Sequence, residues 1–312
     1  MKKFYLMFLG AMAAVSMTAN AASTTVLNET FDWTLGATTS ILGWDTSNES
    51  SYRYDKWSGA NLENPGWYSY SGYVWARPGF IKLGKTKTGG DIESPALAAI
   101  EGTKNLTVTF QAVGYTSAAL TNIDNQELYV GVTGAGKVTK VEVSGLSETG
   151  GAVQSIVNGV AYKQLDAEGN AQDITVDGVA YIKLDSANHF NKTLDPTGLE
   201  VWNKAYSKYT LTVEGATSAT RIFFIGKAMG SMDVTNRIFI DNVTAVASDA
   251  PSALKGDING DGVVNVTDAT SLVNKVLGTA DYADSICDMN ADGVINVTDV
   301  TALVNIILGN SK

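Results

Sequence analysis

Apolar and polar residues alternate along most of the chain between positions 23 and 247. The alternation is clearest in two runs, whose apolar members are Leu106, Val108, Phe110 and Ala112, then Leu128, Val130 and Val132. It returns at Tyr209, Leu211 and Val213, at Ile222 and Phe224, and at Ile238 and Ile240. A period of two places alternate side chains on one face of a strand. Short strands separated by glycine and asparagine, without a long helical period, predict an all-β antiparallel sandwich.

Within this region a ten-residue motif occurs twice, as VNGVAYKQLD at 157–166 and VDGVAYIKLD at 176–185. Asn-Gly and Asp-Gly pairs accept positive φ angles at low cost. We therefore expect hairpin turns at Asn158-Gly159 and at Asp177-Gly178.

The pattern changes after residue 255, where a second repeat begins. GDINGDGVVNVTDATSLVNKVLG at 256–278 aligns with CDMNADGVINVTDVTALVNIILG at 287–309, an offset of 31 residues. Each copy ends in an apolar stripe with helical spacing. The stripes are Leu272, Val276 and Leu277, then Leu303, Ile307 and Leu308. They predict two helices that pack against each other.

Each copy opens with oxygen-bearing residues at positions 1, 3, 5, 7, 9 and 12 of an EF-type loop, with glycine at position 6. The positions are Asp257, Asn259, Asp261, Val263, Asn265 and Asp268, then Asp288, Asn290, Asp292, Val294, Asn296 and Asp299. Calcium takes six to eight oxygen ligands, and position 7 supplies a backbone carbonyl. Magnesium prefers a smaller octahedral shell, and soft metals prefer sulfur or imidazole. The repeat therefore predicts two calcium ions.

A pair of EF-hands would need a helix before each loop, but residues 250–255 form a short linker and 278–286 leave no room for a full helix. Position 12 is aspartate in both copies, where EF-hands usually have glutamate. A duplicated loop and exiting helix resembles the dockerin family over residues 256–309. This resemblance implies calcium-dependent binding to a cohesin-domain protein.

The family's recognition positions carry over onto Val266, Thr267, Val273, Asn274, Val297, Thr298, Val304 and Asn305. The two copies are identical at these positions, so the resemblance implies that either copy could face the partner. They depart from the family's common Ser-Thr and Lys-Arg residues, which leaves the class of partner open. Val273 and Val304 could alternatively extend the helix core.

The first residues have the layout of a secretory signal, with Lys2-Lys3, an apolar run and an Ala19-Asn20-Ala21 cleavage site. We expect a signal peptide at 1–21 and a secreted protein, extracellular or associated with the cell surface. A retained anchor would need a longer apolar run, and no later stretch could span a bilayer. Cys287 is the only cysteine and His189 the only histidine, so an intrachain disulfide or a zinc site is not expected.

The formal charge of −10 argues against nucleic acid or an anionic membrane as the main partner. Residues 256–312 hold eight aspartates and two lysines, so they carry −6 of that charge. This concentration of acid favours a cation there.

The larger region resembles secreted jelly-roll domains of the carbohydrate-binding and adhesin type, on short motifs at 27–31, 93–97 and 237–243. Five of the six tryptophans lie within 43 residues, and aromatic faces stack on sugars. The candidate sugar-binding residues are Trp57, Trp67, Tyr70 and Trp75. The alternative is that these rings pack in the core.

The main hypothesis is a non-catalytic protein in polysaccharide utilisation, with a glycan- or surface-binding sandwich at 22–247, a linker at 248–255 and a dockerin domain at 256–312. One alternative is a glycoside hydrolase, which needs two paired carboxylates. The other is a structural adhesin. No hydrolase motif occurs, and we interpret the scattered glutamates as solvated surface charges. They are Glu29, Glu63, Glu93, Glu127 and Glu200.

Overall fold

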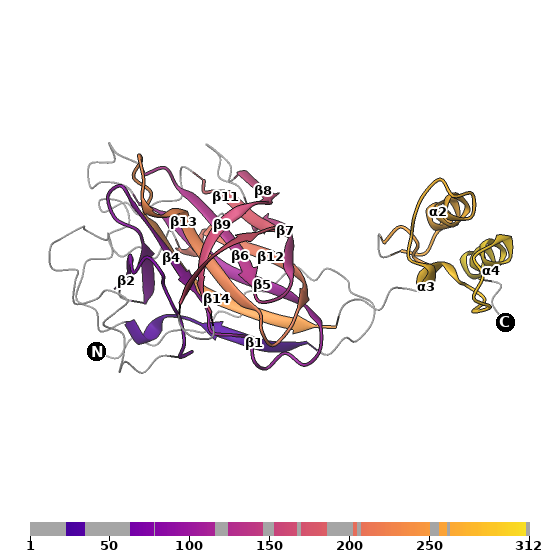
Figure 1. The fold of residues 1–312 in the computed structure, drawn as a ribbon, viewed down its shortest axis with the longest axis horizontal. Helices are drawn as coiled ribbons and strands as arrows, with labels where there is room; N and C mark the ends of the chain where they lie inside the picture. The colour runs from indigo at the N-terminus through magenta and orange to yellow at the C-terminus, as the bar shows by residue number, and fades with distance from the viewer. Residues whose placement is uncertain are drawn as a thin grey trace.

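The computed structural model describes residues 23–34, 63–77, 79–115, 124–145, 153–166, 170–185, 202–204, 207–249, 256–260 and 263–309. They form a β-rich part and a helical part (Figure 1). The predicted signal peptide, Trp57, Asp261, His189 and Glu200 lie outside these ranges. None of the described helices is long and apolar enough to cross a membrane.

The β-rich part contains two antiparallel sheets and a separate two-stranded ribbon. The seven-stranded sheet comprises β1 (Thr24–Glu29), β2 (Val74–Arg77), β3 (Phe80–Leu83), β5 (Lys104–Gly114), β7 (Lys137–Val143), β12 (Lys208–Ala216) and β14 (Ile238–Ser248). The five-stranded sheet comprises β4 (Thr88–Glu93), β6 (Glu127–Thr133), β8 (Val153–Val157), β11 (Val179–Lys183) and β13 (Arg221–Ser231). The ribbon pairs β9 (Val160–Leu165) with β10 (Ala171–Val176), and a short 3-10 helix, η1 (Asp32–Thr34), follows β1.

The strand pairing is that of a rolled hairpin. β3 pairs with β14, β4 with β13, β5 with β12 and β6 with β11, and successive members of each half alternate between the two sheets. This nesting is the double Greek key of a jelly roll. The predicted jelly-roll-like sandwich is therefore confirmed, with β1, β2, β7 and β8 as added strands.

The core lies between the two sheets and consists of the residues that the alternating pattern marked. Phe110 on β5 stacks on Tyr209 of β12, with ring centroids 5.4 Å apart. It also meets the edge of Phe224 on β13, in the opposite sheet, at 5.2 Å. All three side chains are almost fully buried. Since aromatic rings bury large apolar areas, this contact is one of the strongest links between the sheets.

The repeated Asn-Gly and Asp-Gly pairs are not hairpin turns. β8 pairs with β11 and β9 with β10 in one continuous register, so these four strands form a single long hairpin, and beyond β9 Asp166 N donates a hydrogen bond to Asn170 O. The two pairs lie opposite each other and bend both strands. Gly159 and Gly178 have φ angles of 74° and 64°. Asn158 accepts a hydrogen bond from Gly178 N at 2.8 Å, and Asp177 accepts one from Gly159 N at 2.9 Å.

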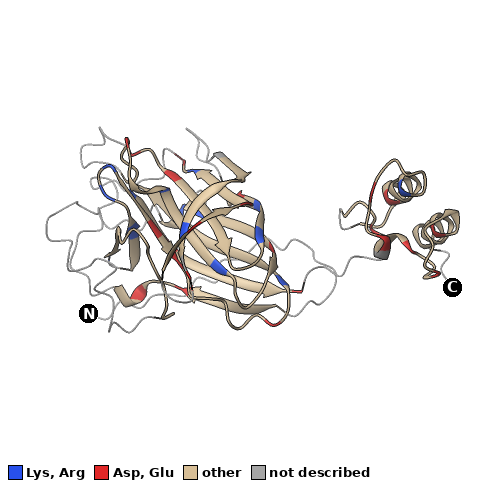
Figure 2. Cartoon of the chain, viewed as in Figure 1, with Lys and Arg blue, Asp and Glu red and all other residues tan. Residues whose placement is uncertain are grey.

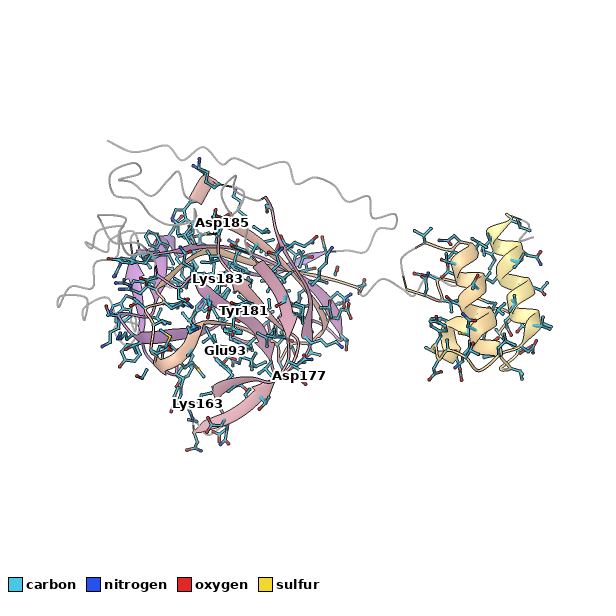
Figure 3. All side chains as sticks on the ribbon, turned by 90° about the horizontal axis from the view of Figure 1, so that it is seen from above. Glu93, Lys163, Asp177, Tyr181, Lys183 and Asp185 are labelled. Carbon is cyan, nitrogen blue, oxygen red and sulfur yellow. The ribbon has the colours of Figure 1, made fainter. Side chains whose placement is uncertain are left out.

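Beyond this bend, β9 and β10 form an arm that lies against the outer face of the five-stranded sheet. Figure 3 shows the arm as a separate ribbon that carries Lys163. Tyr162 is 1% exposed and stacks on Phe223 of β13 at 4.4 Å. Phe223 faces away from the main core, because its neighbour Phe224 faces into it. The sheet is thus covered on both faces at this point.

Two of the glutamates that we interpreted as surface charges are buried. Glu29 is 0% exposed and accepts hydrogen bonds from Trp33 Nε1 at 3.0 Å and Trp67 Nε1 at 2.9 Å. Glu93 is 3% exposed and accepts one from Thr133 Oγ1 at 2.5 Å. Each carboxylate is compensated by several donors, which the alternation of apolar residues could not reveal.

Burial is the main cause that raises the pKa of Asp241 on β14, to about 8. Burial also raises the pKa values of Glu29, Asp91 and Glu93. A raised pKa means that the folded state holds a proton that the unfolded chain releases near pH 4. The stability of the sandwich should therefore fall as pH rises from about 4 to 8.

We predict a slope that approaches about 1.4 kcal/mol per pH unit for one proton, measured by denaturant titration with tryptophan fluorescence in chelator. All six tryptophans precede residue 203, so this signal reports on the sandwich alone. Asp241→Asn should flatten the profile, whereas Asp249→Asn, at a side chain 58% exposed, should leave it unchanged. Stability that rises over this window would contradict the prediction.

Candidate metal centres and partner-binding face

The helical part contains α2 (Val266–Val276), α3 (Asp284–Cys287) and α4 (Val297–Ile307). Its small core is formed by Ile258, Leu272, Cys287, Met289 and Leu303. The predicted contact between the helices is therefore correct for Leu272 and Leu303, and the free Cys287 is buried between them and the loops. Figure 2 shows that acidic side chains predominate in this part.

The two long helices begin in the same way. Asn265 and Asn296 are the N-cap residues, and each accepts a hydrogen bond from the backbone N–H two residues ahead. Asp268 and Asp299, at loop position 12, complete the capping boxes by accepting from the N-cap backbone N–H at 2.9 Å. A capping box satisfies N–H groups that a helix start leaves unpaired.

The same aspartates reach back to the start of each loop. Asp268 Oδ1 accepts from Asn259 N at 3.1 Å, and Asp299 Oδ1 accepts from Met289 N at 2.8 Å. Both side chains are 0% exposed. Burial raises the pKa of Asp299, but backbone hydrogen bonds from Asn296, Asn290 and Met289 outweigh it and hold the pKa below its ordinary value. Asp299 is therefore ionised at neutral pH.

The second loop is described in full. Asp288 Oδ2 accepts from Gly293 N at 2.9 Å, and Asp292 Oδ1 accepts from Val294 N at 2.8 Å. The turn passes through Gly293, at position 6, with a φ of 82°. These contacts fold positions 1 to 7 into a tight loop that starts and ends beside Asp299. In the first loop, Asp257, Asn259, Val263 and Asn265 are described, and Asp261 lies outside the described residues.

The donor chemistry of the loops fits calcium. The six positions offer only carboxylate, amide and backbone carbonyl oxygens, the ligands that calcium takes. Among the described residues no three Asp, Glu, His or Cys side chains already converge on one point. In the second loop the reason is that Asp288 and Asp292 are turned to backbone N–H groups. The residues that would hold the ion are those at positions 1, 3, 5, 7, 9 and 12, and the ion would cross-link each loop to its helix.

None of the eight positions carried over as partner-binding residues is buried, and the two copies present their valines almost identically. Val266 is 70% exposed and Val297 is 67%, while Val273 is 38% and Val304 is 36%. The alternative that Val273 and Val304 extend the helix core is therefore wrong. Thr267, Thr298 and Asn305 are exposed, and Asn274 is half-buried.

Leu277 and Leu308 do not pack between the helices as expected, because they are 68% and 65% exposed. Each is the C-cap residue, and it lies eleven positions after Val266 or Val297, on the same side of its helix. Each leucine extends the row of exposed valines on its helix by one turn. The spacing from Val266 and Val297 could have predicted that both leucines are exposed. We placed them between the helices because they are apolar.

The four candidate sugar-binding residues have different outcomes in the structure. Trp67 is 6% exposed and Trp75 is 5% exposed, so neither offers a ring face to a sugar, and the core-packing alternative is correct for both. Trp67 packs against Phe31 at 5.5 Å, and the Lys82 ammonium covers Trp75 at 4.7 Å. Trp57 lies outside the described residues. Tyr70 is 39% exposed and remains a candidate.

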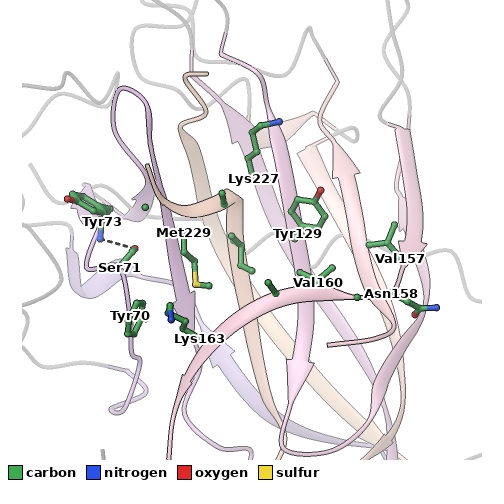
Figure 4. A pocket seen from close by; sticks show the side chains of 15 residues that line it. Tyr70, Ser71, Tyr73, Tyr129, Val157, Asn158, Val160, Lys163, Lys227 and Met229 are labelled. Carbon is green, nitrogen blue, oxygen red and sulfur yellow. Dashed lines mark hydrogen bonds between the residues drawn. The ribbon is translucent and has the colours of Figure 1, made fainter. Parts of the chain in front are cut away.

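Tyr70 borders a cleft of about 590 Å³ between the arm and the outer face of the five-stranded sheet. We call it the arm cleft. Figure 4 shows the side chains that line it, from segment 70–73, β6, β8, the bend, β9 and β13. Sequence reasoning missed the cleft, because it depends on where the bent hairpin folds back. The tyrosines, lysines and methionine that line it are Tyr70, Tyr73, Tyr129, Lys163, Lys227 and Met229.

A β-bulge shapes one wall of the arm cleft. The pairing of β13 with β4 shifts register between Ile225 and Gly230. Lys227, within the bulge, has a φ of 66°, a conformation that costs a non-glycine residue about 1 to 3 kcal/mol. Gly89 on β4 makes room for it, because a Cβ there would lie 1.8 Å from Ala228 O. Bulges of this kind re-aim side chains beside binding sites.

The capping geometry predicts the cost of losing a position-12 carboxylate. Asp299→Ala removes acceptors from three backbone N–H groups and should destabilise the helical part by about 1 to 3 kcal/mol. The helical circular dichroism signal should then be lost at lower temperature. Asp281→Ala is the matched control, because Asp281 is 97% exposed and pairs with Lys275 rather than with a backbone N–H of the loop. Equal effects of the two variants would exclude the capping role.

The family comparison agrees with the geometry of the helical part. Residues 255–308 match the family model described as Dockerin type I domain. No curated protein matches the chain. Type I dockerins bind calcium and use it to bind cohesins in cellulosome-like assemblies. In residues 255–308, therefore, this chain has a type I dockerin domain.

Proposed function

We propose that this chain is a secreted, non-catalytic component of a polysaccharide-degrading assembly. Its dockerin domain binds a cohesin-bearing protein, and its sandwich binds glycan. In this proposal a signal peptide at 1–21 is removed, the sandwich occupies 22–247, a linker 248–255, and the dockerin domain 256–312. The mature protein then acts outside the cell or at its surface.

The observation that carries the proposal is the duplicated exposed face of the dockerin domain. Two copies of Val-Thr and Val-Asn lie on α2 and α4, and the exposures of their matching valines agree within a few per cent. Exposed valines at matching positions have no role in the core of so small a domain, and apolar patches of this kind mark protein-binding surfaces. Either copy would therefore be able to meet the same cohesin surface.

Two calcium ions, one in each loop, complete the proposed interface. Among its described residues this domain buries five apolar side chains fully, so it gains little from apolar burial alone, and metal binding would supply much of its folding free energy. Four of the partner-binding residues occupy positions 10 and 11 of the loops themselves. Loss of calcium would therefore disorder the loops and the face together.

For the sandwich, a binding role is favoured over catalysis. Among the described lining residues of the arm cleft there is no Asp, Glu or His, so the cleft lacks the carboxylate pair of a glycoside hydrolase. Asp91 and Glu93, which lie nearby on β4, are 0% and 3% exposed. Their carboxyl groups accept hydrogen bonds from backbone and side-chain groups of the sandwich. A purely structural adhesin would leave the exposed Tyr70 ring without a ligand.

Capture of a cohesin-domain protein tests the two calcium ions and the partner-binding face together. Purified mature protein should bind a cohesin-domain protein from the secreted fraction of its source, identified by mass spectrometry, and chelator should abolish the capture. Asp257→Asn with Asp288→Asn should do the same, because position 1 is lost in both loops. Capture that persists in chelator would refute the proposal.

The duplicated face gives a sharper expectation. Val266→Asp with Thr267→Asp should leave capture nearly intact, as should Val297→Asp with Thr298→Asp, because the other copy still binds. All four substitutions together should abolish it. Ile306→Asp is the control on α4, since Ile306 is 36% exposed but on another side of the helix. Loss of capture in either two-residue variant would show that only that copy binds.

A further inference from the structure

We propose that the arm cleft is the glycan site of the sandwich and that its ligand is a neutral oligosaccharide. This inference rests on the glycan-binding role proposed above and assigns it to residues other than the tryptophan-rich segment. The cleft measures about 590 Å³, within the range of sites for small ligands. Its lining side chains come from the outer face of the five-stranded sheet, the arm and segment 70–73 (Figure 4).

The walls of the arm cleft combine aromatic rings with hydrogen-bond donors. Tyr70 is 39% exposed, with the Lys163 ammonium 5.4 Å from its ring centroid, and Tyr73 and Tyr129 are half-buried, so all three rings are partly accessible. The apolar faces of a sugar ring stack on such surfaces, while its hydroxyls need polar partners. Lys163, Lys227 and Asn158 supply these partners at the edges of the cleft.

Buried carboxylates fix both walls before any ligand arrives. Asp91 accepts hydrogen bonds from Tyr70 N at 2.9 Å and Ser71 N at 2.8 Å, which holds segment 70–71. On the arm, Gln164 donates to Thr133 Oγ1 at 2.8 Å, and Thr133 donates to Glu93. Binding sites with walls fixed in this way lose little conformational entropy on binding.

The charges of the lining residues favour a neutral ligand. Lys227 pairs with Glu127 at 2.7 Å, and Lys163 pairs with Asp173. An ammonium carries three N–H donors, so each lysine can still donate to a hydroxyl while its charge stays compensated. A carboxylate ligand would have to compete with Glu127 and Asp173, whereas a sugar hydroxyl would not.

The experiment measures binding of the full-length protein to soluble neutral polysaccharides, namely xylan, glucomannan and mixed-linkage β-glucan, with polygalacturonate as the acidic probe. Affinity electrophoresis and calorimetry give the dissociation constants. We expect at least one neutral polymer to bind. Tyr70→Ala and Tyr129→Ala should each weaken binding of that polymer about tenfold, as expected for a central aromatic contact. Tyr70→Phe keeps the ring and should bind as tightly as the unchanged protein.

Two controls separate failure of the cleft from failure of the wider proposal. Ile156→Ala, at an exposed residue of β8 that does not line the cleft, should leave glycan binding unchanged. Asp257→Asn with Asp288→Asn should abolish cohesin capture but not glycan binding. Tryptophan fluorescence confirms that each variant keeps its sandwich.

Every other outcome overturns the inference in a recognisable way. Neutral-polymer binding that survives both tyrosine variants would place the glycan site elsewhere and leave the glycan role intact. Binding of polygalacturonate alone would refute the neutral class. Binding of none of the four polymers would refute both the cleft and the glycan role, while cohesin capture would still support the dockerin proposal.

Discussion

Buried carboxylates that accept several hydrogen bonds hold this molecule together in both of its parts. Glu29 ties β1 to the indole groups of Trp33 and Trp67, and Asp299 ties the start of a loop to the start of a helix. A buried charge is tolerated only when donors surround it, so each of these residues fixes the segments that supply the donors. With one cysteine in the chain, no intrachain disulfide can do this work.

The sequence predicts the architecture correctly where it follows from the two faces of a strand or from the spacing of ligands in a loop. Leu106, Val108 and Phe110 alternate with polar residues and are buried as expected, because a strand has only two faces. The loop spacing was equally informative, since calcium ligands must follow one another in a fixed order. The jelly-roll topology needed the structure, because the pairing of β3 with β14 joins segments more than 150 residues apart.

The predictions that were wrong have a common cause. The type of a residue does not determine whether its side chain is buried or exposed. Trp67 and Trp75 are as suited to a core as to a sugar site, and their burial was decided by the strands around them. Glu93 resembled a surface charge, but Thr133 and Gln164 meet it from distant segments. Asn158-Gly159 permits a hairpin turn or a bend equally well, and the opposing Asp177-Gly178 selects the bend.

That bend connects the local sequence to the proposed function. A straight hairpin would extend past the edge of the sheet and leave Phe223 and Tyr129 exposed, without the second wall of a cleft. The bend instead places Tyr162 over Phe223 and Lys163 beside Tyr70, so burial of apolar surface forms the site. If the arm cleft binds glycan as proposed, it would need only modest affinity, because attachment through the dockerin domain would raise its effective concentration at the glycan. The two parts would then divide the task, with the dockerin domain supplying location and the sandwich supplying selectivity.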